Sequence, residues 1–250
     1  MNGIKKGANP TPPEMTVATD EVHIWSIPLA LTDSQIRKLA LYLATDEVER
    51  WQRFYFERDR NRFVIARGSL RLILSAYIGR QPYEIQFDYN KYGKPFLNYN
   101  SGGDKIRFNL SHSHELALVG VTGLHDIGID VEYMQTRVAD LSIAERFFSP
   151  KEVAILRKLP VALQRQAFFN CWTRKEAYIK AQGQGLSLAL DSFDVAFVPD
   201  QPAALLHTRP DAREAAQWSI YNLPQSADYA AAVAVKGKNH RLKFFTWSPN

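Results

Sequence analysis

The segment Ile127-Gly128-Ile129-Asp130-Val131-Glu132 has the alternation of a strand that buries one face in a core. Residues two apart on a strand project from the same face, so Asp130 and Glu132 point one way while Ile129 and Val131 point into the core. Two neighbouring carboxylates repel each other and are costly to bury unpaired. A hard divalent cation would hold them, since Mg²⁺ takes one or two protein carboxylates together with phosphate and water. The pair therefore predicts a metal–phosphate site, and a solvated pair of acids at a strand end is the alternative.

The elements on either side of this strand fall into two halves of similar order. The first half is expected to contain a strand at 22–28, helices opening at Thr32-Asp33 and at Asp46, a long helix at 59–79, a loop at 88–103, and strands at 106–110 and 116–122 joined by a turn at 111–114. The second half is expected to contain helices at 141–147, 150–158 and 161–182 and strands at 193–198, 218–221, 229–235 and 242–247. The fold class is thus α+β, with two pseudo-symmetric halves that each pack a long helix on a small antiparallel sheet.

The predicted boundaries follow from this repeat. We expect a flexible segment at 1–19, an N-terminal half at 20–124 and a C-terminal half at 125–250. A ligand site is expected in a cleft between the halves, because pockets form preferentially at domain interfaces.

Composition limits the classes of protein. The chain has 250 residues, of which 46% are hydrophobic, so it can build a substantial core. No apolar run approaches the roughly 18 residues that span a bilayer, and the N-terminus lacks the apolar segment of a secretory signal. The one cysteine, Cys171, excludes an internal disulfide and fits a reducing compartment, so a cytoplasmic location is expected. Its aromatic surroundings favour a buried, inert thiol over a nucleophile.

The net charge of +5 is concentrated in one window. Between positions 50 and 71 there are seven arginines and two acids, which gives the same net charge as the whole chain. The arginines are Arg50, Arg53, Arg58, Arg60, Arg62, Arg67 and Arg71. Such a patch attracts nucleic acid, a membrane surface or a phosphorylated cofactor, and a solvated helix face is the plainer alternative. The aromatic residues between the arginines have helical spacing, which favours core packing over RNA binding.

A second group of charges lies on the predicted helix at 161–182. The spacing of four places Trp172, Glu176 and Lys180 on one face. A surface ion pair is the alternative, but Trp172 argues against a fully solvated face. Glu176 would add a third carboxylate to a hard-metal site, and a lysine one turn away would meet a phosphate.

Two turns carry further polar groups. Asn109-Leu110-Ser111-His112-Ser113 places a hydroxyl and an imidazole between two apolar strands, where they can donate to phosphate or simply satisfy a local turn. Tyr92-Gly93-Lys94-Pro95 predicts a turn that presents a lysine. A zinc site built on His112, His114 and His125 is disfavoured, because no cysteine or fourth histidine stands nearby at a suitable spacing.

Five segments in this order resemble the 4′-phosphopantetheinyl transferases, and in particular the Sfp-like branch that holds two pseudo-symmetric halves in one chain. The segments are Tyr92-Gly93-Lys94-Pro95, Phe108-Asn109-Leu110-Ser111-His112-Ser113, Ile127-Gly128-Ile129-Asp130-Val131-Glu132, Phe147-Phe148-Ser149-Pro150-Lys151-Glu152 and Trp172-Thr173-Arg174-Lys175-Glu176-Ala177-Tyr178-Ile179-Lys180-Ala181. The resemblance covers roughly Thr45 to Val198, and the last fifty residues match only in strand pattern.

The resemblance implies a holo-[acyl-carrier-protein] synthase type enzyme with coenzyme A bound between its halves. The 4′-phosphopantetheine group would move from coenzyme A to a serine hydroxyl of an apo acyl or peptidyl carrier protein, releasing 3′,5′-ADP. By position, Asp130, Glu132 and Glu176 would hold Mg²⁺ or alternatively Mn²⁺ on the pyrophosphate, and Asp130 and Lys180 would also contact the cofactor. Ser111, His112, Lys94 and Pro95 would grip the nucleotide and its phosphates, and Arg50 and Arg62 would lie near the 3′-phosphate. Glu47 stands where a relative has a basic residue, and Arg53 offers a substitute.

The chemistry needs charge neutralisation and positioning more than covalent help from the enzyme. The general base is either Glu176 or a metal-bound water, and Lys180 acts at the reacting phosphate. We expect a monomer with neither nucleic acid nor membrane as a partner. Two other functions are considered, a non-catalytic polyanion-binding protein built on the arginine window and a metal-dependent hydrolase of nucleotide pyrophosphates. Fatty-acid, polyketide and peptide synthesis all remain open as the pathway served.

Overall fold

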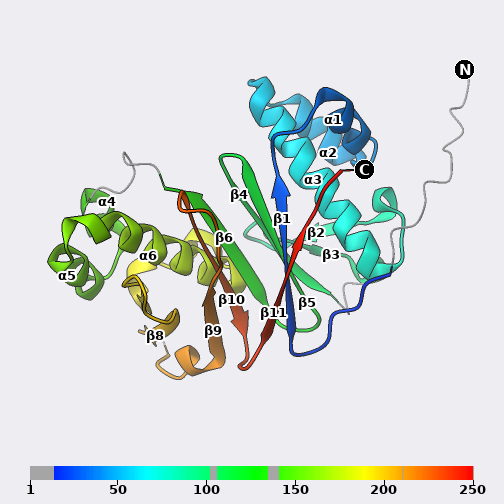
Figure 1. The fold of residues 1–250 in the computed structure, drawn as a ribbon. Helices are drawn as coiled ribbons and strands as arrows, with labels where there is room; N and C mark the ends of the chain where they lie inside the picture. The colour runs from blue at the N-terminus through cyan, green and yellow to red at the C-terminus, as the bar shows by residue number, and fades with distance from the viewer. Residues whose placement is uncertain (1–13, 102–105, 135–140, 210, 250) are drawn as a thin grey trace, which may run out of the picture.

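The computed structural model describes residues 14–101, 106–134, 141–209 and 211–249. Most of the segment expected to be flexible, residues 1–13, lies outside the described residues. Two α+β bodies stand side by side, with the long helices α3 and α6 on the outer faces of their sheets (Figure 1). Across the described residues, no helix combines the length and the apolar character needed to cross a membrane.

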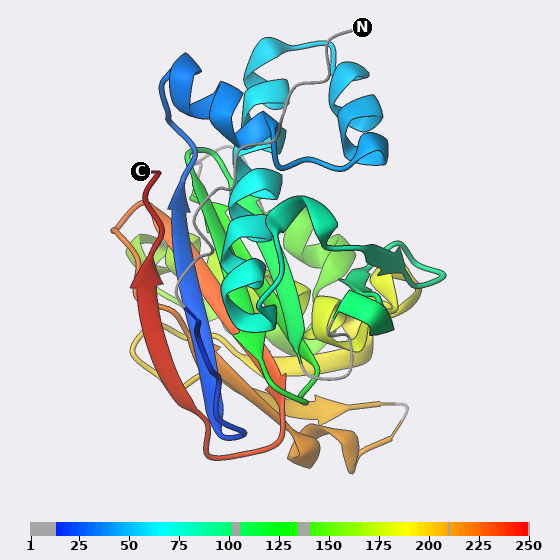
Figure 2. The same ribbon diagram turned by 90° about the vertical axis from the view of Figure 1, so that its right-hand side faces the viewer.

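The first half is an antiparallel sheet covered by three helices. Its elements are β1 (Glu21–Pro28), α1 (Asp33–Ala40), α2 (Thr45–Gln52), α3 (Glu57–Ile78), β4 (Arg107–Ser113) and β5 (Leu116–Thr122). The strand order is β1-β5-β4, with Trp25 opposite Val119 and Ser111 opposite Leu118. Helix α3 runs along one face of this sheet, and Leu70 and Leu74 are fully buried against it (Figure 2).

The second half repeats this order. Its elements are β6 (Ile127–Tyr133), α4 (Leu141–Phe147), α5 (Pro150–Lys158), α6 (Val161–Gln182), β7 (Phe193–Ala196), β8 (Ala204–Thr208), β9 (Trp218–Asn222) and β10 (Tyr229–Lys236). The strand order β6-β10-β9 matches β1-β5-β4, and β7 and β8 form a separate pair. Helices α3 and α6 both have 22 residues, and each ends at a left-handed glycine, Gly79 or Gly183. The α+β fold with two similar halves is therefore confirmed.

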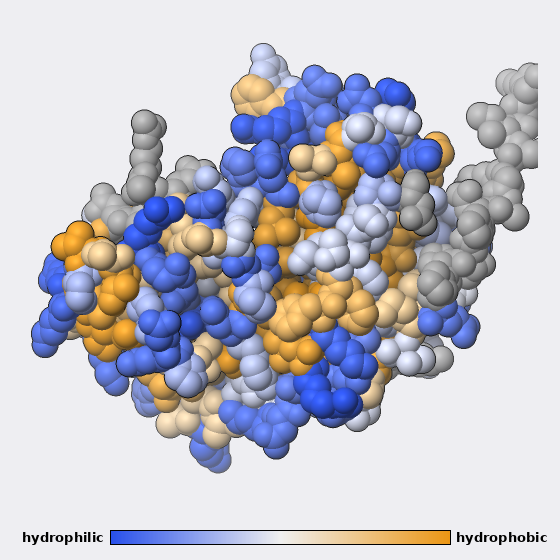
Figure 3. Space-filling model, viewed as in Figure 1, coloured by the Kyte–Doolittle hydropathy of each residue, from blue (hydrophilic) through white to orange (hydrophobic). Residues whose placement is uncertain are grey.

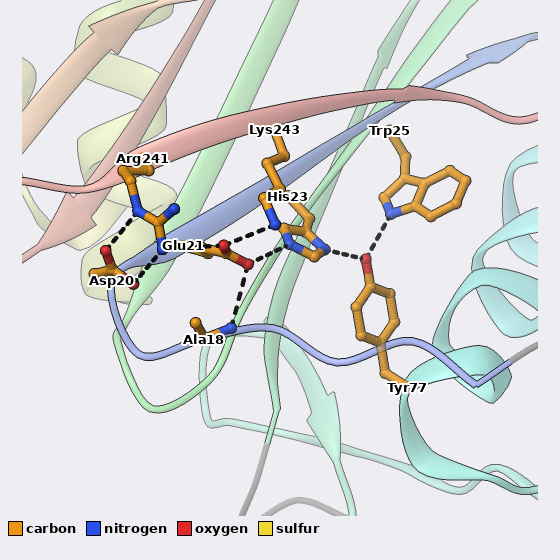
Figure 4. A network of polar contacts seen from close by, with 8 residues as sticks. All are labelled: Ala18, Asp20, Glu21, His23, Trp25, Tyr77, Arg241 and Lys243. Atoms are coloured by element: carbon orange, nitrogen blue, oxygen red, sulfur yellow. Dashed lines mark hydrogen bonds and ion pairs between the residues drawn. The ribbon is translucent and has the colours of Figure 1, made fainter.

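The last strand returns to the first half. A boundary at 124/125 would assign β11 (Arg241–Thr246) to the second half, but β11 pairs in parallel with β1. Asp20 and Glu21 bind Arg241 of β11, and Lys243 lies 2.7 Å from the Glu21 carboxylate (Figure 4). Hydrogen bonds from Lys243 and then from His23 lower the pKa of Glu21 to about 2.

Behind these ion pairs a buried hydrogen-bond chain links β1 to α3. The Trp25 indole N–H donates to the Tyr77 hydroxyl over 2.9 Å, and that hydroxyl lies 2.7 Å from His23 Nδ1 (Figure 4). An indole can only donate, so the Tyr77 hydroxyl is free to donate its own proton to Nδ1. The Nε2–H of a neutral His23 then donates to Glu21 over 3.1 Å. Each polar group in this chain has a partner.

The structure corrects two expectations in the region of the turns. The segment 88–103 is not simply a loop, because β2 (Phe87–Tyr89) and β3 (Pro95–Leu97) form a hairpin. The Asn90 side chain closes it by accepting the amides of residues 92 and 94. The expected turn at 111–114 is also wrong, because β4 extends to Ser113 and its polar side chains bond to β6.

Three further differences concern the ends of the helices and strands. Helix α2 begins one residue before Asp46, and the amide of Ala44 donates to the carboxylate of Glu47 over 2.9 Å. Strand β8 has no counterpart in the predicted elements. Short 3₁₀ turns occupy Pro82–Glu84, Tyr99–Ser101, Gly185–Ser187, Leu190–Ser192 and Glu214–Gln217.

Candidate active site

A glycine brings α6 onto β6. A Cβ at Gly128 would lie 2.1 Å from the carbonyl oxygen of Ala177 and 2.2 Å from the amide nitrogen of Ala181, so no other residue fits without moving the helix. Asp130 shares this strand face with Gly128. The close approach therefore sets the Glu176 and Lys180 turns of α6 directly against the carboxylates of β6.

The contact between the helix and the strand is an ion pair. Lys180 Nζ lies 2.5 Å from Asp130 Oδ1 and 2.9 Å from Ser111 Oγ, and Ser111 Oγ lies 3.0 Å from the same carboxylate oxygen. Asp130 is 2% exposed, and its other oxygen, Oδ2, is buried without a hydrogen-bond partner among the described residues. A buried carboxylate oxygen without a partner is costly, so this position favours a cation beyond Lys180.

The pKa shifts of the neighbouring charged groups also indicate an excess of negative charge around Asp130. Burial, and then the charge of Asp130, raises the pKa of Glu132 to about 7, and the same two causes raise the pKa of Glu176. Burial alone would lower the pKa of Lys180, but the charges of Asp130, Glu176 and Glu132 outweigh it and raise that pKa. The negative charges of three carboxylates therefore act on a single ammonium group, that of Lys180.

The side chains around Asp130 have the chemistry that binds a hard divalent cation, but they are not already arranged as a metal site. The described residues contain no group of three or more His, Cys, Asp and Glu side chains already placed to hold a metal ion. The acids and serines around Asp130 supply oxygen donors, Asp130 Oδ2 is unsatisfied, and the cluster carries excess negative charge. Mg²⁺ needs only one or two protein carboxylates when phosphate supplies the rest. These residues can hold Mg²⁺ once Lys180 shares or yields its place beside Asp130.

Polar side chains at every second position of β4 join the two halves. Asn109 Oδ1 accepts the amide of Ile129 over 2.9 Å, and Ser111 binds Asp130. Ser113 Oγ accepts the amide of Tyr133 over 3.0 Å and donates to Glu132 over 2.9 Å. Strands β4 and β6 thus meet through side chains rather than through a backbone ladder, and the sequence interpretation missed this role for Asn109 and Ser113. Polar residues at 109, 111 and 113, matching the acids at 130 and 132, were the available signal.

His112 points the other way, toward α3. It is exposed, yet desolvation of its ring and then the positive charges of Lys180 and Arg62 lower its pKa. Asp59, also on α3, opposes that shift. The first turns of α3 lie beside the end of β4, because Val64 and Ile65 pack in one core with Leu110, and the charge of Arg62 therefore acts on His112.

The arginine window divides into an inner and an outer part. Arg67 and Arg71 are buried, and both bind Glu47, with Arg71 Nε 2.6 Å from its carboxylate. Arg71 also donates to the carbonyls of Pro82 and Ile85. A patch built on all seven arginines is therefore wrong, and Glu47 belongs to a structural cluster.

The outer arginines lie differently. Arg50 is exposed and sits 5.5 Å from the ring centre of Phe63, and Arg53 pairs loosely with Glu49 over 3.9 Å.

The β2–β3 hairpin closes the other end of the seam. Lys94 Nζ donates to the carbonyls of Ile127 and Ala181 over 3.0 and 3.1 Å, and Asn90 donates to the carbonyl of Gly183. Desolvation lowers the pKa of Lys94 to about 8, against the charge of Asp126. A cavity of about 420 Å³ lies here between the hairpin and the end of α6, and its lining includes Lys94, Pro95, Tyr99, Phe108 and Gln182.

The family models and the relatives that match this chain belong to one family. Residues 126–234 match the model of the 4′-phosphopantetheinyl transferase superfamily, and residues 30–122 match that of the 4′-phosphopantetheinyl transferase N-terminal domain. The 4′-phosphopantetheinyl transferase HetI of Nostoc sp. strain PCC 7120 is 42% identical over 94% of this chain and 96% of its own. A 4′-phosphopantetheinyl transferase of Bacillus subtilis is 32% identical over 77% of this chain and 82% of its own, and Sfp of Bacillus subtilis strain 168 is 28% identical over 82% and 88%.

Proposed function

Since this chain belongs to the 4′-phosphopantetheinyl transferase superfamily, we propose that the carboxylates at its β4–β6–α6 seam act on the pyrophosphate of coenzyme A. The protein transfers 4′-phosphopantetheine from coenzyme A to a carrier protein. We further propose a metal ion at the site and a role for each of its residues. The observation that carries it is the buried, unsatisfied Asp130 Oδ2 in a cluster of three acids and one lysine.

Asp130, Glu132 and Glu176 would hold Mg²⁺. When bound there, the ion supplies positive charge to the pyrophosphate oxygens. The raised pKa values of Glu132 and Glu176 support this assignment, because they record a local excess of negative charge that a cation relieves.

Lys180 stabilises the phosphate at the reacting end. Its side chain is 29% exposed and its ammonium group lies beside Asp130 and Ser111, so it can reach a phosphate that enters the seam. A fixed cation aimed at charge that develops during transfer acts mainly on the transition state.

Glu176 accepts the proton of the attacking serine. Glu176 lies one helical turn from Lys180 on the same face of α6, so both side chains reach the same part of the seam. The nucleophile comes from the carrier protein, so the chain needs no serine triad of its own.

The nucleotide end of coenzyme A lies toward the hairpin and α3 in this proposal. Ser111, His112, Lys94 and the backbone of Pro95 contact the nucleotide and its phosphates, and Arg50 and Arg62 contact the 3′-phosphate. The nearness of Arg62 to His112 and the aromatic lining of the cavity beside Lys94 support these roles.

The setting of the enzyme is also proposed. It works in the cytoplasm as a monomer, and its partners are coenzyme A and an apo acyl or peptidyl carrier protein rather than nucleic acid or a membrane. The burial of the single cysteine, Cys171, is compatible with a reducing compartment.

The test is to incubate the protein with coenzyme A, Mg²⁺ and several apo carrier proteins and to measure their intact masses. We expect at least one carrier to gain a single phosphopantetheine group, and the gain to disappear when a chelator replaces Mg²⁺. Loss of coenzyme A without any modified carrier would instead indicate a pyrophosphate hydrolase. Transfer that continues undiminished with the chelator would contradict the metal assignment.

A further inference from the structure

Two exposed aromatic rings lie where α2 passes into α3. Tyr55 and Phe56 are 87% and 62% exposed, and their rings meet edge to face with centroids 5.0 Å apart. Figure 3 shows a small apolar patch bordered by strongly hydrophilic residues at the top of the molecule, where this connection lies. Aromatic residues are enriched in interfaces, so an exposed pair that packs together is a candidate contact surface for a partner.

The surface around the rings is positively charged. With Arg67 and Arg71 buried, the window from 50 to 71 retains five arginines against two acids, a net of +3. Arg58 pairs with the adjacent Asp59 over 3.5 Å, and its side chain is 71% exposed. Exposed pairs of this kind contribute little, so Arg58 can exchange Asp59 for an acid on a partner.

This surface adjoins the candidate active site. Val64 and Ile65 of α3 pack in one core with Leu110 of β4, the neighbour of Ser111, so the first turns of α3 lie beside the seam. A helix rises about 1.5 Å per residue, so Phe56 is about 9 Å along α3 from Arg62. A typical interface covers about 800 Å² of each partner, equivalent to a circle of roughly 16 Å radius. A protein that presents a side chain at the seam from the α3 side therefore has the extent to cover Tyr55 and Phe56 as well.

We propose that Tyr55, Phe56, Arg53 and Arg58 form the docking surface for the apo carrier protein. The partner that fits is a small protein with an apolar groove bordered by acidic side chains. The inference rests on the proposed function, because that reaction takes its serine from a second protein. Aromatic anchors within a ring of charge have the composition of binding hot spots, and the arginines steer an acidic partner toward the site.

The test compares kinetic constants for the two substrates. In Tyr55→Ser/Phe56→Ser and in Arg58→Glu, the KM for an apo carrier that the wild type modifies should rise by about tenfold or more, as for loss of a hot spot. The KM for coenzyme A should stay within about twofold of the wild type in Tyr55→Ser/Phe56→Ser. In Arg58→Glu the KM for the carrier should rise by a larger factor than the KM for coenzyme A, because Arg58 lies one turn from Arg62 on α3. The melting temperature should not fall in either variant, since the altered side chains are exposed and a serine at position 56 can cap α3.

Two matched controls separate docking from general effects. Arg213→Glu reverses an arginine that is 89% exposed and paired with Asp211, as Arg58 is paired with Asp59. Phe244→Ser removes a ring that is 51% exposed on β11. Both controls should keep the KM for the carrier.

Three outcomes would contradict the proposal. An unchanged KM for the carrier in both test variants would overturn the docking surface alone. A rise of the same size in the controls would show a nonspecific effect of charge or apolar area, and would also overturn it. Absence of product with the wild type would overturn the proposed function, and the docking surface with it.

Discussion

In each half a glutamate of a short helix is buried against a cation of the long helix that follows. Glu47 of α2 lies 2.6 Å from Arg71 of α3, and Glu152 of α5 lies 2.8 Å from Lys175 of α6. Each cation stands fourteen residues after the first residue of its helix, at 57 and 161. Each also donates to two carbonyls of the segment beyond the helix, at 82 and 85 in one half and at 190 and 193 in the other.

The halves differ in the strand face that each long helix covers. On β1, His23 and Trp25 face α3, and both bond to the Tyr77 hydroxyl, so their polar groups have partners. On β6, Gly128 and the two acids face α6, and Asp130 Oδ2 is left without a partner. The glutamates of the repeated scaffold are thus paired with cations, whereas the acid cluster at the seam has more carboxylates than cations. Buried charges that a fold leaves uncompensated are those that a ligand has to complete.

The largest expected effect follows from removing one charge of that cluster. Asp130→Asn should reduce transfer by at least about 10²–10³-fold, the cost of losing one electrostatic contact to a transition state. Its melting temperature without metal should change little, because the lost ion pair with Lys180 is offset by the removal of repulsion on Glu132 and Glu176. Mass-spectrometric rates and thermal unfolding check both. A near wild-type rate at saturating Mg²⁺ would remove Asp130 from the site.

Removing the charge of a structural carboxylate and removing that of a seam carboxylate should have different effects on the free energy of unfolding. Glu47→Gln should lower the free energy of unfolding by about 3–5 kcal/mol, because it leaves the buried Arg67 and Arg71 uncompensated. Glu132→Gln is the matched change at the seam and should leave that free energy equal or higher in the absence of metal. Urea unfolding with a chelator present measures both. Equal losses in the two variants would show that the acid cluster is structural as well.

A smaller effect concerns the approach of α6 to β6. Gly128→Ala should destabilise the protein by about 1–3 kcal/mol, because its Cβ meets the helix backbone. Its rate should also fall, since α6 carries Glu176 and Lys180. Gly120→Ala is the control, because a Cβ there meets only the flexible end of Ile127, 2.7 Å away. If both variants retain wild-type transfer and stability, the close approach does not position the site.

The smallest effect is a dependence on pH at the hairpin. Lys94 has a pKa of about 8, so its charge is lost as the pH rises through that value. The KM for coenzyme A should therefore increase above pH 8 in the wild type, and this increase should disappear in Lys94→Arg. Stability should change in the opposite direction. Between pH 8 and the ordinary lysine pKa of about 10.4 the unfolded chain binds more protons, so folding becomes more favourable as the pH rises. A KM that is flat from pH 7 to 9.5 would remove Lys94 from the binding site.

Local periodicity was enough to predict much of this molecule. The strand at 127–132 and the helix at 161–182 follow from repeats of 2 and 3.6, and the same repeats place Asp130 with Glu132 and Glu176 with Lys180. Contacts between distant segments could not be obtained in this way. The pairing of β11 with β1 joins residues about 220 positions apart, and no pattern within either strand specifies its partner.

The charged residues show the same limit. The sequence gives no sign that Arg67 and Arg71 turn inward, because their burial depends on Glu47 of a neighbouring helix. The role of Gly128 likewise depends on how closely a later helix approaches.

We propose that the acids at the β6–α6 contact form a cation site that a bound ion completes. Titration calorimetry of Mg²⁺ into the protein saturated with coenzyme A tests it most directly, with wild type, Asp130→Asn/Glu176→Gln and Glu47→Gln compared at a temperature where all three are folded. We predict one Mg²⁺ per chain in the wild type and in Glu47→Gln, and no detectable binding in the double variant. Binding of Mg²⁺ to the double variant with wild-type affinity would contradict the account.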